Sequence, residues 1–214
     1  ARFDETTQLP VIAYQGVPDR IDFVCQLAAN WLALAATPPA ERRLGLIFAN
    51  YPNKDGRMGN GVGLDSPASA LNLLEALADQ GYGVGELPGK GDDLIRKLAA
   101  GPTNNLKDRA SRSGGITFAL ADYQSFFDAL PEAVRAQVIT RWGAPEEDPF
   151  VVGDDFVLPA FTQGNVVIGL QPARGYNIDP KSSYHDPDLV PPHGYLAFYG
   201  WLRQGFQAQA NIHM

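Results

Sequence analysis

The sequence predicts an α/β fold in which helices flank a partly parallel sheet. Residues 44–49 form a short continuous apolar run, typical of a strand buried on both faces of a parallel sheet. A helical pattern follows it, and we expect the next strand at 82–87. Strand, helix and strand in this order make a βαβ unit, so we expect parallel pairing with a right-handed crossover. Further along, apolar runs at 154–161 and 165–170 flank a short gap that contains Gly164, which predicts a β-hairpin.

The helices are predicted from apolar residues that recur every three or four positions, and from residues that commonly begin or end a helix. In the βαβ unit, Ser66 is the expected N-cap, Pro67 lies in the first turn and Gly81 ends the helix. Residues 101–115 are polar and rich in Gly, Ser and Asn, so we expect a loop there. A last strand is expected at 210–213. The remaining helices are expected at 18–37, 92–100, 122–130, 132–142 and 193–206.

Composition excludes several classes of protein. The chain has 214 residues, of which 45% are hydrophobic and 19% charged, enough apolar material for a core. Its net charge of −7 argues against nucleic acid or an anionic membrane as a partner. There is no apolar run long enough for a membrane span, and the lone Cys25 fits a reducing cytoplasm. We treat 1–214 as a single α/β region of a longer chain, since it begins at Ala1 and stops inside the last strand.

A Gly-rich loop at 53–65 is the first candidate for ligand binding. It lies between a strand and a helix start, where backbone N–H groups attract anions and glycines allow a ligand to approach closely. Its spacing matches neither phosphate-loop fingerprint, so nucleotide binding is disfavoured. An amide-lined pocket for a carboxylate or carboxamide and a rigid connector both remain open. The residues that would line such a pocket are Asn60, Gly61, Gly63 and Asp65.

The segment 171–195 is the second candidate, because prolines stiffen it and it carries many polar side chains. Arg174 can bind a carboxylate in bidentate fashion, and Tyr176 offers a flat face to a ring system. Imidazole and carboxylate groups could ligate a divalent metal, although they match no structural zinc pattern. The same groups could instead cap the following helix. The candidate metal ligands are His185, Asp186, Asp188, His193 and, at the end of the last strand, His213.

Two long motifs make the chain similar to a known family. The first comprises LIFANYP at 46–52, DGR at 55–57 and GNGVGLDSPAS at 59–69. The second comprises GNV at 164–166, QPARGY at 171–176, YHDPDL at 184–189 and PHGYLAFY at 192–199. In order and spacing they resemble the large subunit of aerobic cobaltochelatase. The magnesium chelatase large subunit is a sister family that resembles the chain less well, because it usually lacks the PARGY and YHDPD stretches.

The resemblance implies an ATP-dependent chelatase that inserts cobalt(II), its substrate metal, into hydrogenobyrinic acid a,c-diamide in cobalamin biosynthesis. Partner subunits of the AAA+ ATPase type would hydrolyse the ATP, which fits the missing phosphate loop. On this interpretation His185, His193 and His213 deliver metal or accept protons, with Asp186 and Asp188 as further metal ligands. The corrin would be bound by Asn60, Gly61, Gly63, Asp65, Gln171, Arg174 and Tyr176. Magnesium insertion into protoporphyrin IX and a non-catalytic tetrapyrrole-binding or assembly module are the alternatives.

Overall fold

The computed structural model describes residues 2–12, 14–51, 53–175 and 188–214. It divides into two compact units, residues 1–38 and 39–214. In the first unit, β1 (Arg2–Asp4) and β2 (Leu9–Val11) pair as an antiparallel hairpin and α1 spans Pro18–Ala36. The helix ends where Thr37 Oγ1 donates to the Ala33 carbonyl at 2.7 Å, immediately before a proline pair.

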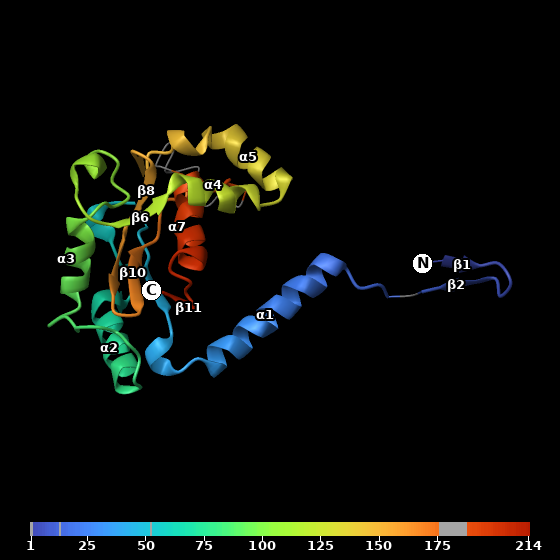
Figure 1. Cartoon of the computed structure of the whole chain (residues 1–214), viewed down its shortest axis with the longest axis horizontal. Helices are drawn as coiled ribbons and strands as arrows, with labels where there is room; N and C mark the ends of the chain where they lie inside the picture. Colours follow the sequence, from blue (N-terminus) through green and yellow to red (C-terminus); the bar gives the residue numbers. More distant parts are fainter. Residues whose placement is uncertain (1, 13, 52, 176–187) are drawn as a thin grey trace. The chain divides into compact units, whose positions relative to one another are not determined.

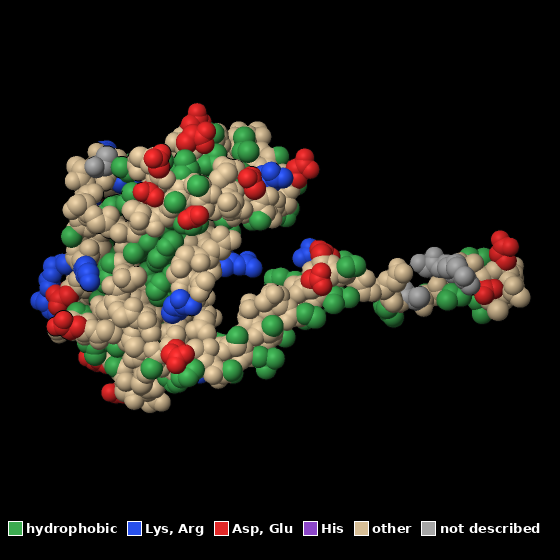
Figure 2. Space-filling view, in the orientation of Figure 1, with side chains coloured by type: hydrophobic (Ala, Val, Ile, Leu, Met, Phe, Trp, Pro, Cys, Tyr) green, Lys and Arg blue, Asp and Glu red, His purple; other side chains and the backbone are tan. Residues whose placement is uncertain are grey.

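Helix α1 confirms the helix predicted at 18–37, yet none of its residues is buried. Phe23, Trp31 and Leu32 are each more than half exposed, and Figure 2 shows apolar side chains along its surface. Across the described stretches of the chain, no helix combines the length and apolarity needed to cross a membrane.

The second unit is built on a four-stranded sheet in the order β11-β3-β10-β9. Strand β3 (Leu44–Phe48) pairs in parallel with β10 (Val166–Leu170) on one side and with β11 (Ala210–His213) on the other. Strand β9 (Ala160–Gln163) pairs antiparallel with β10. The predicted hairpin is therefore confirmed, and Gly164 makes its turn with φ of +58°.

Helices cover both faces of this sheet, which is why β3 and β10 are continuously apolar. Leu46 and Phe48 belong to a core shared with α2 (Ser66–Asp79) and α3 (Asp92–Ala100). Ile47 points the other way, into a core shared with α4 (Leu120–Asp128), α5 (Glu132–Trp142) and α7 (His193–Gln204). Figure 1 shows α2 and α3 on one side of β10 and α7 on the other.

A second, antiparallel sheet has the order β6-β8-β7, made by Ile116–Ala119, Asp155–Leu158 and Val151–Val152. The apolar run predicted at 154–161 is divided between two sheets, because Pro159 separates β8 from β9 and has no N–H to pair. Two further short strands, β4 (Asn60–Gly61) and β5 (Leu64–Asp65), form a hairpin of their own. Short 3₁₀ turns cover Pro39–Glu41, Asp55–Arg57, Arg109–Ser111 and Pro145–Glu147.

Two local predictions are wrong. Residues 82–87 form no strand, because Gly85 has φ of +68° and the Gly83 carbonyl turns to accept from the Asn165 N–H. The parallel partners of β3 come instead from far later in the sequence, and β10, α7 and β11 supply the βαβ unit. The N-cap of α2 is Asp65, whose carboxylate accepts from the Ala68 N–H at 3.0 Å, while Ser66 is the first helical residue.

The close packing of β10 against α7 predicts that Gly169 tolerates no side chain. A Cβ at this position would lie 2.8 Å from Cζ of the buried Phe198. We expect Gly169→Ala to lower the free energy of unfolding by about 1–3 kcal/mol, as overpacked cores do. Gly56→Ala is the control, because a Cβ at Gly56 meets nothing within 4 Å. Urea denaturation measures both, and equal midpoints for the two variants would contradict the packing argument.

Candidate functional site

The carboxyl ends of three parallel strands, β3, β10 and β11, meet at one edge of the central sheet, called here the carboxyl edge. Just past β10, the Gln171 N–H still donates to the Phe48 carbonyl at 2.9 Å. Just past β11, the Met214 N–H donates to the Ile47 carbonyl at 2.9 Å, and its own carbonyl accepts from Ala49. Open α/β sheets bind their ligands at this edge. Residues that follow the three strands are therefore the first place to look for a site.

The side-chain amide of Asn104 joins two of these strand ends. Its Nδ2 donates to Asn50 Oδ1 and to the Gln171 carbonyl, each at 2.8 Å, and its Oδ1 accepts from the Ala173 N–H at 3.1 Å. Asn104 is only 3% exposed and Asn50 5%. Asn50 Nδ2 in turn donates to the Lys54 carbonyl at 2.9 Å. Buried amides therefore connect the chain after β3 to the chain after β10.

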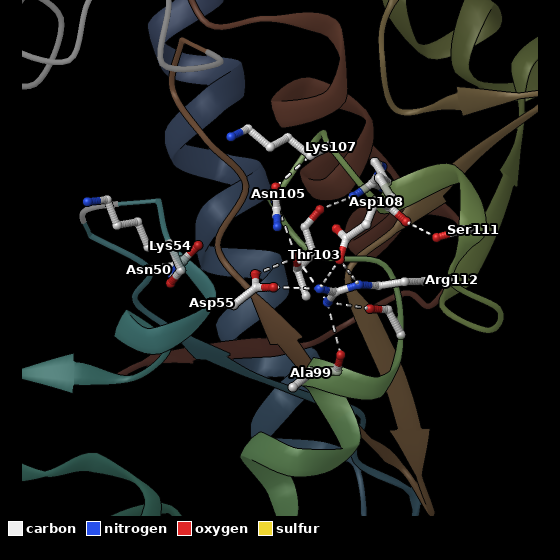
Figure 3. A network of polar contacts seen from close by, with 12 residues as sticks. Asn50, Lys54, Asp55, Ala99, Thr103, Asn105, Lys107, Asp108, Ser111 and Arg112 are labelled. Atoms are coloured by element: carbon white, nitrogen blue, oxygen red, sulfur yellow. Dashed lines mark hydrogen bonds and ion pairs between the residues drawn. The ribbon is translucent and has the colours of Figure 1, made fainter.

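An ionic network continues from this amide pair through the loop at 101–115 (Figure 3). Arg112 Nη2 lies 2.6 Å from Asp55 Oδ2 and 2.7 Å from Asp108 Oδ2. Thr103 Oγ1 donates to Asp55 Oδ1 at 2.7 Å. Burial alone would raise the pKa of Asp55, but the hydrogen bonds from Thr103 and Arg112 outweigh it and hold that pKa below its ordinary value. The predicted loop is thus fastened to the start of the Gly-rich loop.

The Gly-rich loop itself folds into the exposed β4–β5 hairpin, where Asn60 pairs with Asp65 and Gly61 with Leu64. Its tip at Val62 is fully exposed, and Gly63 has φ of +77°. Because the Asp65 carboxylate already accepts from the first turn of α2, it occupies part of the anion-attracting helix start. A pocket lined by the backbone amides of Asn60, Gly61 and Gly63 stays a prediction.

The segment 171–195 is described only at its two ends. Tyr176, His185 and Asp186 lie outside the described residues. Arg174 is exposed just after the bonded Gln171–Ala173 stretch, and Asp188 is exposed at the far end. The Gln171 side chain lies close enough to Tyr199 on α7 to lower the pKa of that phenol, against the larger rise that burial causes. Within the described residues, no three His, Cys, Asp or Glu side chains converge in a way that could hold a metal ion.

His193 is a core residue, with 0% of its surface exposed. Its Nε2 lies 3.1 Å from the Gly143 carbonyl, which can only accept, so Nε2 carries the proton. Nδ1 then accepts from the Tyr123 hydroxyl at 2.6 Å. Burial lowers the pKa of His193, although the Gly143 carbonyl and Asp148 partly oppose that shift. With both ring nitrogens engaged, this imidazole joins α4, the end of α5 and the start of α7.

His213 lies at the end of β11 and is exposed. Its ring is nearly parallel to that of Tyr199, at 20° with 6.2 Å between centroids. Tyr199 also contacts the ring of Tyr195 at 5.0 Å, and its burial raises the pKa of its phenol. The structure therefore brings His213 to the same edge as Gln171, and places His193 elsewhere, inside the core.

Several residues of the carboxyl edge were not singled out from the sequence. Some lie in the loop at 101–115, which has no motif, and the others lie within a motif whose neighbouring residues were chosen instead. One available signal is the density of Asn and Arg in the loop at 101–115, since such groups need partners once the loop folds onto a sheet. The residues missed in this way are Asn50, Asp55, Thr103, Asn104, Asp108, Arg112, Tyr195 and Tyr199.

The environment of His193 predicts how stability depends on pH. The folded-state pKa of His193 lies below the ordinary 6.5. Below about pH 6.5 the imidazole therefore binds a proton in the unfolded chain but stays neutral in the folded chain. The free energy of unfolding should therefore fall as pH drops through this window, and less steeply in His193→Gln. Denaturation at pH 7.5 and pH 5.5 compares the two proteins, with Tyr123→Phe as a control that keeps the imidazole. Identical pH slopes for wild type and His193→Gln would overturn this interpretation.

Comparison with known proteins matches residues 1–214 to the family described as CobN/Magnesium Chelatase. The aerobic cobaltochelatase subunit CobN of Sinorhizobium sp is 52% identical over 99% of this chain and 16% of that protein. The CobN subunit of Pseudomonas aeruginosa is 49% identical over 98% of this chain and 17% of that protein. A magnesium-chelatase subunit of Chlorobaculum parvum is 30% identical over 92% of this chain and 15% of that protein.

A solved structure agrees with these relatives. The catalytic subunit of cobaltochelatase from Mycobacterium tuberculosis superposes with a TM-score of 0.80 at 37% identity. The match covers 99% of this chain and 18% of that structure, so the chain spans under a fifth of the proteins it matches. The resemblance expected from the two motifs is confirmed. The chain belongs to the CobN/magnesium chelatase family, with the CobN cobaltochelatase subunits as the better match.

Proposed function

We propose that this chain forms part of the large subunit of a cobaltochelatase, which inserts Co²⁺ into hydrogenobyrinic acid a,c-diamide in cobalamin biosynthesis. The observation that carries the proposal is the identity of 52% and 49% to two CobN subunits, against 30% to a magnesium-chelatase subunit. The polar carboxyl edge, with His213, Gln171 and the exposed Arg174 beside it, supports a site for a metal and a carboxylate-bearing macrocycle.

Metal insertion must remove water from Co²⁺ and protons from the inner nitrogens of the macrocycle. An imidazole can serve either step, since it binds metals when neutral and accepts protons near neutral pH. His213 is the exposed one of the two described histidines, so we assign it this role first, with His185, Asp186 and Asp188 as further candidates. His193, whose nitrogens are both hydrogen-bonded, is assigned the support of α7.

The other groups are assigned to substrate and partners. Arg174 would bind a carboxylate arm of the corrin through its guanidinium, assisted by the amides of the β4–β5 hairpin. ATP would be bound and hydrolysed by partner subunits of the AAA+ type, because this sequence contains no phosphate-binding fingerprint. The complex would work in the cytoplasm, where reduced thiols such as Cys25 are usual.

The choice of metal and macrocycle tests the function directly. The complete protein that carries this chain is combined with its ATPase partners, ATP and hydrogenobyrinic acid a,c-diamide. We expect Co²⁺ to change the absorption spectrum of the corrin as it is inserted, and Mg²⁺ to give no insertion into protoporphyrin IX. Magnesium insertion without cobalt insertion would assign the chain to the sister enzyme. Corrin binding without insertion of either metal would favour a passive binding module.

The same assay tests the role of His213. We expect His213→Ala to lower the cobalt insertion rate about 100-fold, the usual scale for losing a group that transfers protons. The control is Asn211→Ala, because Asn211 lies two residues earlier on the same face of β11. Initial insertion rates at saturating cobalt and corrin measure both variants. A His213→Ala protein that keeps more than half of the wild-type rate would rule out this assignment.

A further inference from the structure

We infer that Asn104 is a positioning residue for the macrocycle site: its side-chain amide holds the chain after β3 and the chain after β10 at a fixed separation, and thereby places Arg174. The inference rests on the proposed function, which it deepens by naming a residue that no motif singled out. The ligand concerned is a macrocycle that carries carboxylate arms, because the group so placed is a guanidinium.

Asn104 uses both side-chain N–H donors and its side-chain oxygen at this edge. Both Nδ2 protons are donated, one to Asn50 Oδ1 and one to the Gln171 carbonyl, while Oδ1 accepts from the Ala173 N–H. The bond to Asn50 and the bonds to 171–173 span separations of 54, 67 and 69 residues in sequence. At 3% exposure there is little water to replace any of them. A single side chain therefore joins three segments that are remote from one another in sequence.

This amide acts where the strand ladder stops. Regular pairing between β3 and β10 ends at Phe48 and Leu170, and one more backbone bond follows, from the Gln171 N–H to the Phe48 carbonyl. Beyond it, the Gln171 carbonyl and the next available N–H, that of Ala173, both bond to the Asn104 side chain. The path of the backbone as it leaves β10 toward Arg174 is thus set by Asn104.

The same amide also reaches the other loop of the proposed site. Asn50 receives one proton of Asn104 and gives its own to the Lys54 carbonyl, just before the turn Asp55–Arg57. The neighbouring Thr103 binds Asp55 at 2.7 Å, so two adjacent residues fasten the same loop. Without the hydrogen bonds of Asn104, the segment that carries Arg174 and the Gly-rich loop at 53–65 could move independently. Binding of a ligand that must contact both would then be weaker.

The chain offers a matched control at the opposite end of β10. Asn165, in the turn that precedes this strand, donates its Nδ2 to the Ala40 carbonyl at 2.7 Å, a contact that spans 125 residues. It is also a long-range bond from an asparagine amide to a backbone carbonyl. However, it lies at the amino end of the strand, away from the carboxyl edge. A purely structural role for such amides predicts the same kinetic effect from removing either one.

The test compares Asn104→Ala, Asn104→Asp and Asn165→Ala in the complete protein, assayed with its ATPase partners for cobalt insertion. We expect both Asn104 variants to raise KM for hydrogenobyrinic acid a,c-diamide at least tenfold with kcat changed less than threefold, and Asn165→Ala to leave KM within twofold of wild type. Asn104→Asp keeps the shape and the acceptor for Ala173 but loses both donors, so it should be no better than Asn104→Ala.

Each result decides one point. If the wild-type protein inserts no cobalt, the proposed function fails. If wild type is active and Asn104→Ala raises KM no more than Asn165→Ala does, the inference about Asn104 is overturned. Should Asn104→Ala not fold, as judged by far-ultraviolet circular dichroism, Asn50→Ala replaces it, since that change removes one of the three bonds. A threefold or larger rise in KM for Asn50→Ala then supports the inference, and an unchanged KM overturns it.

Discussion

The parallel pairing of β3 with β10 on one side and β11 on the other is the constraint on which the rest of this structure depends. Because all three strands run in the same direction, the residues that follow them emerge at one edge. Helices cover both faces of the sheet, so only its edges can present backbone and polar groups to a ligand. The location of Asn50, Gln171 and His213 is a consequence of strand direction, although they lie far apart in sequence.

Strand ends carry polar backbone groups that need partners as soon as the ladder stops, and here the loop at 101–115 provides them. Asn104 hydrogen-bonds the backbone groups that follow β10. Thr103 and Arg112 bind the carboxylate of Asp55 in the segment that follows β3. Burying such groups without partners would cost about 1–3 kcal/mol each. The loop at 101–115, which carries no motif, is therefore fixed by the carboxyl edge, and it fixes in turn the segments that follow β3 and β10.

The parts of the fold that could be predicted are those set by local pattern. The helices follow from their apolar periodicity, and β3 follows from an apolar run that only a doubly covered strand can bury. Residues 82–87 show the limit of such patterns. A short segment of this kind can pair in a sheet, or it can contribute one core residue from an irregular segment, as Val84 does. Pairing partners, the cap at Asp65 and the contacts of Asn104 depend on distant residues, which periodicity does not report.

Histidine shows most clearly why residue type alone could not locate the site. His193 and His213 were equal candidates in the sequence, but the fold buries one and exposes the other. The two are nevertheless connected. His193, bonded to Tyr123 and to the Gly143 carbonyl, fixes the first turn of α7, and α7 carries the Tyr199 ring that lies parallel to His213. A neutral, buried imidazole thus supports the helix that orients the exposed one. The motif around His193 can matter for the chemistry at the edge even though His193 itself lies in the core.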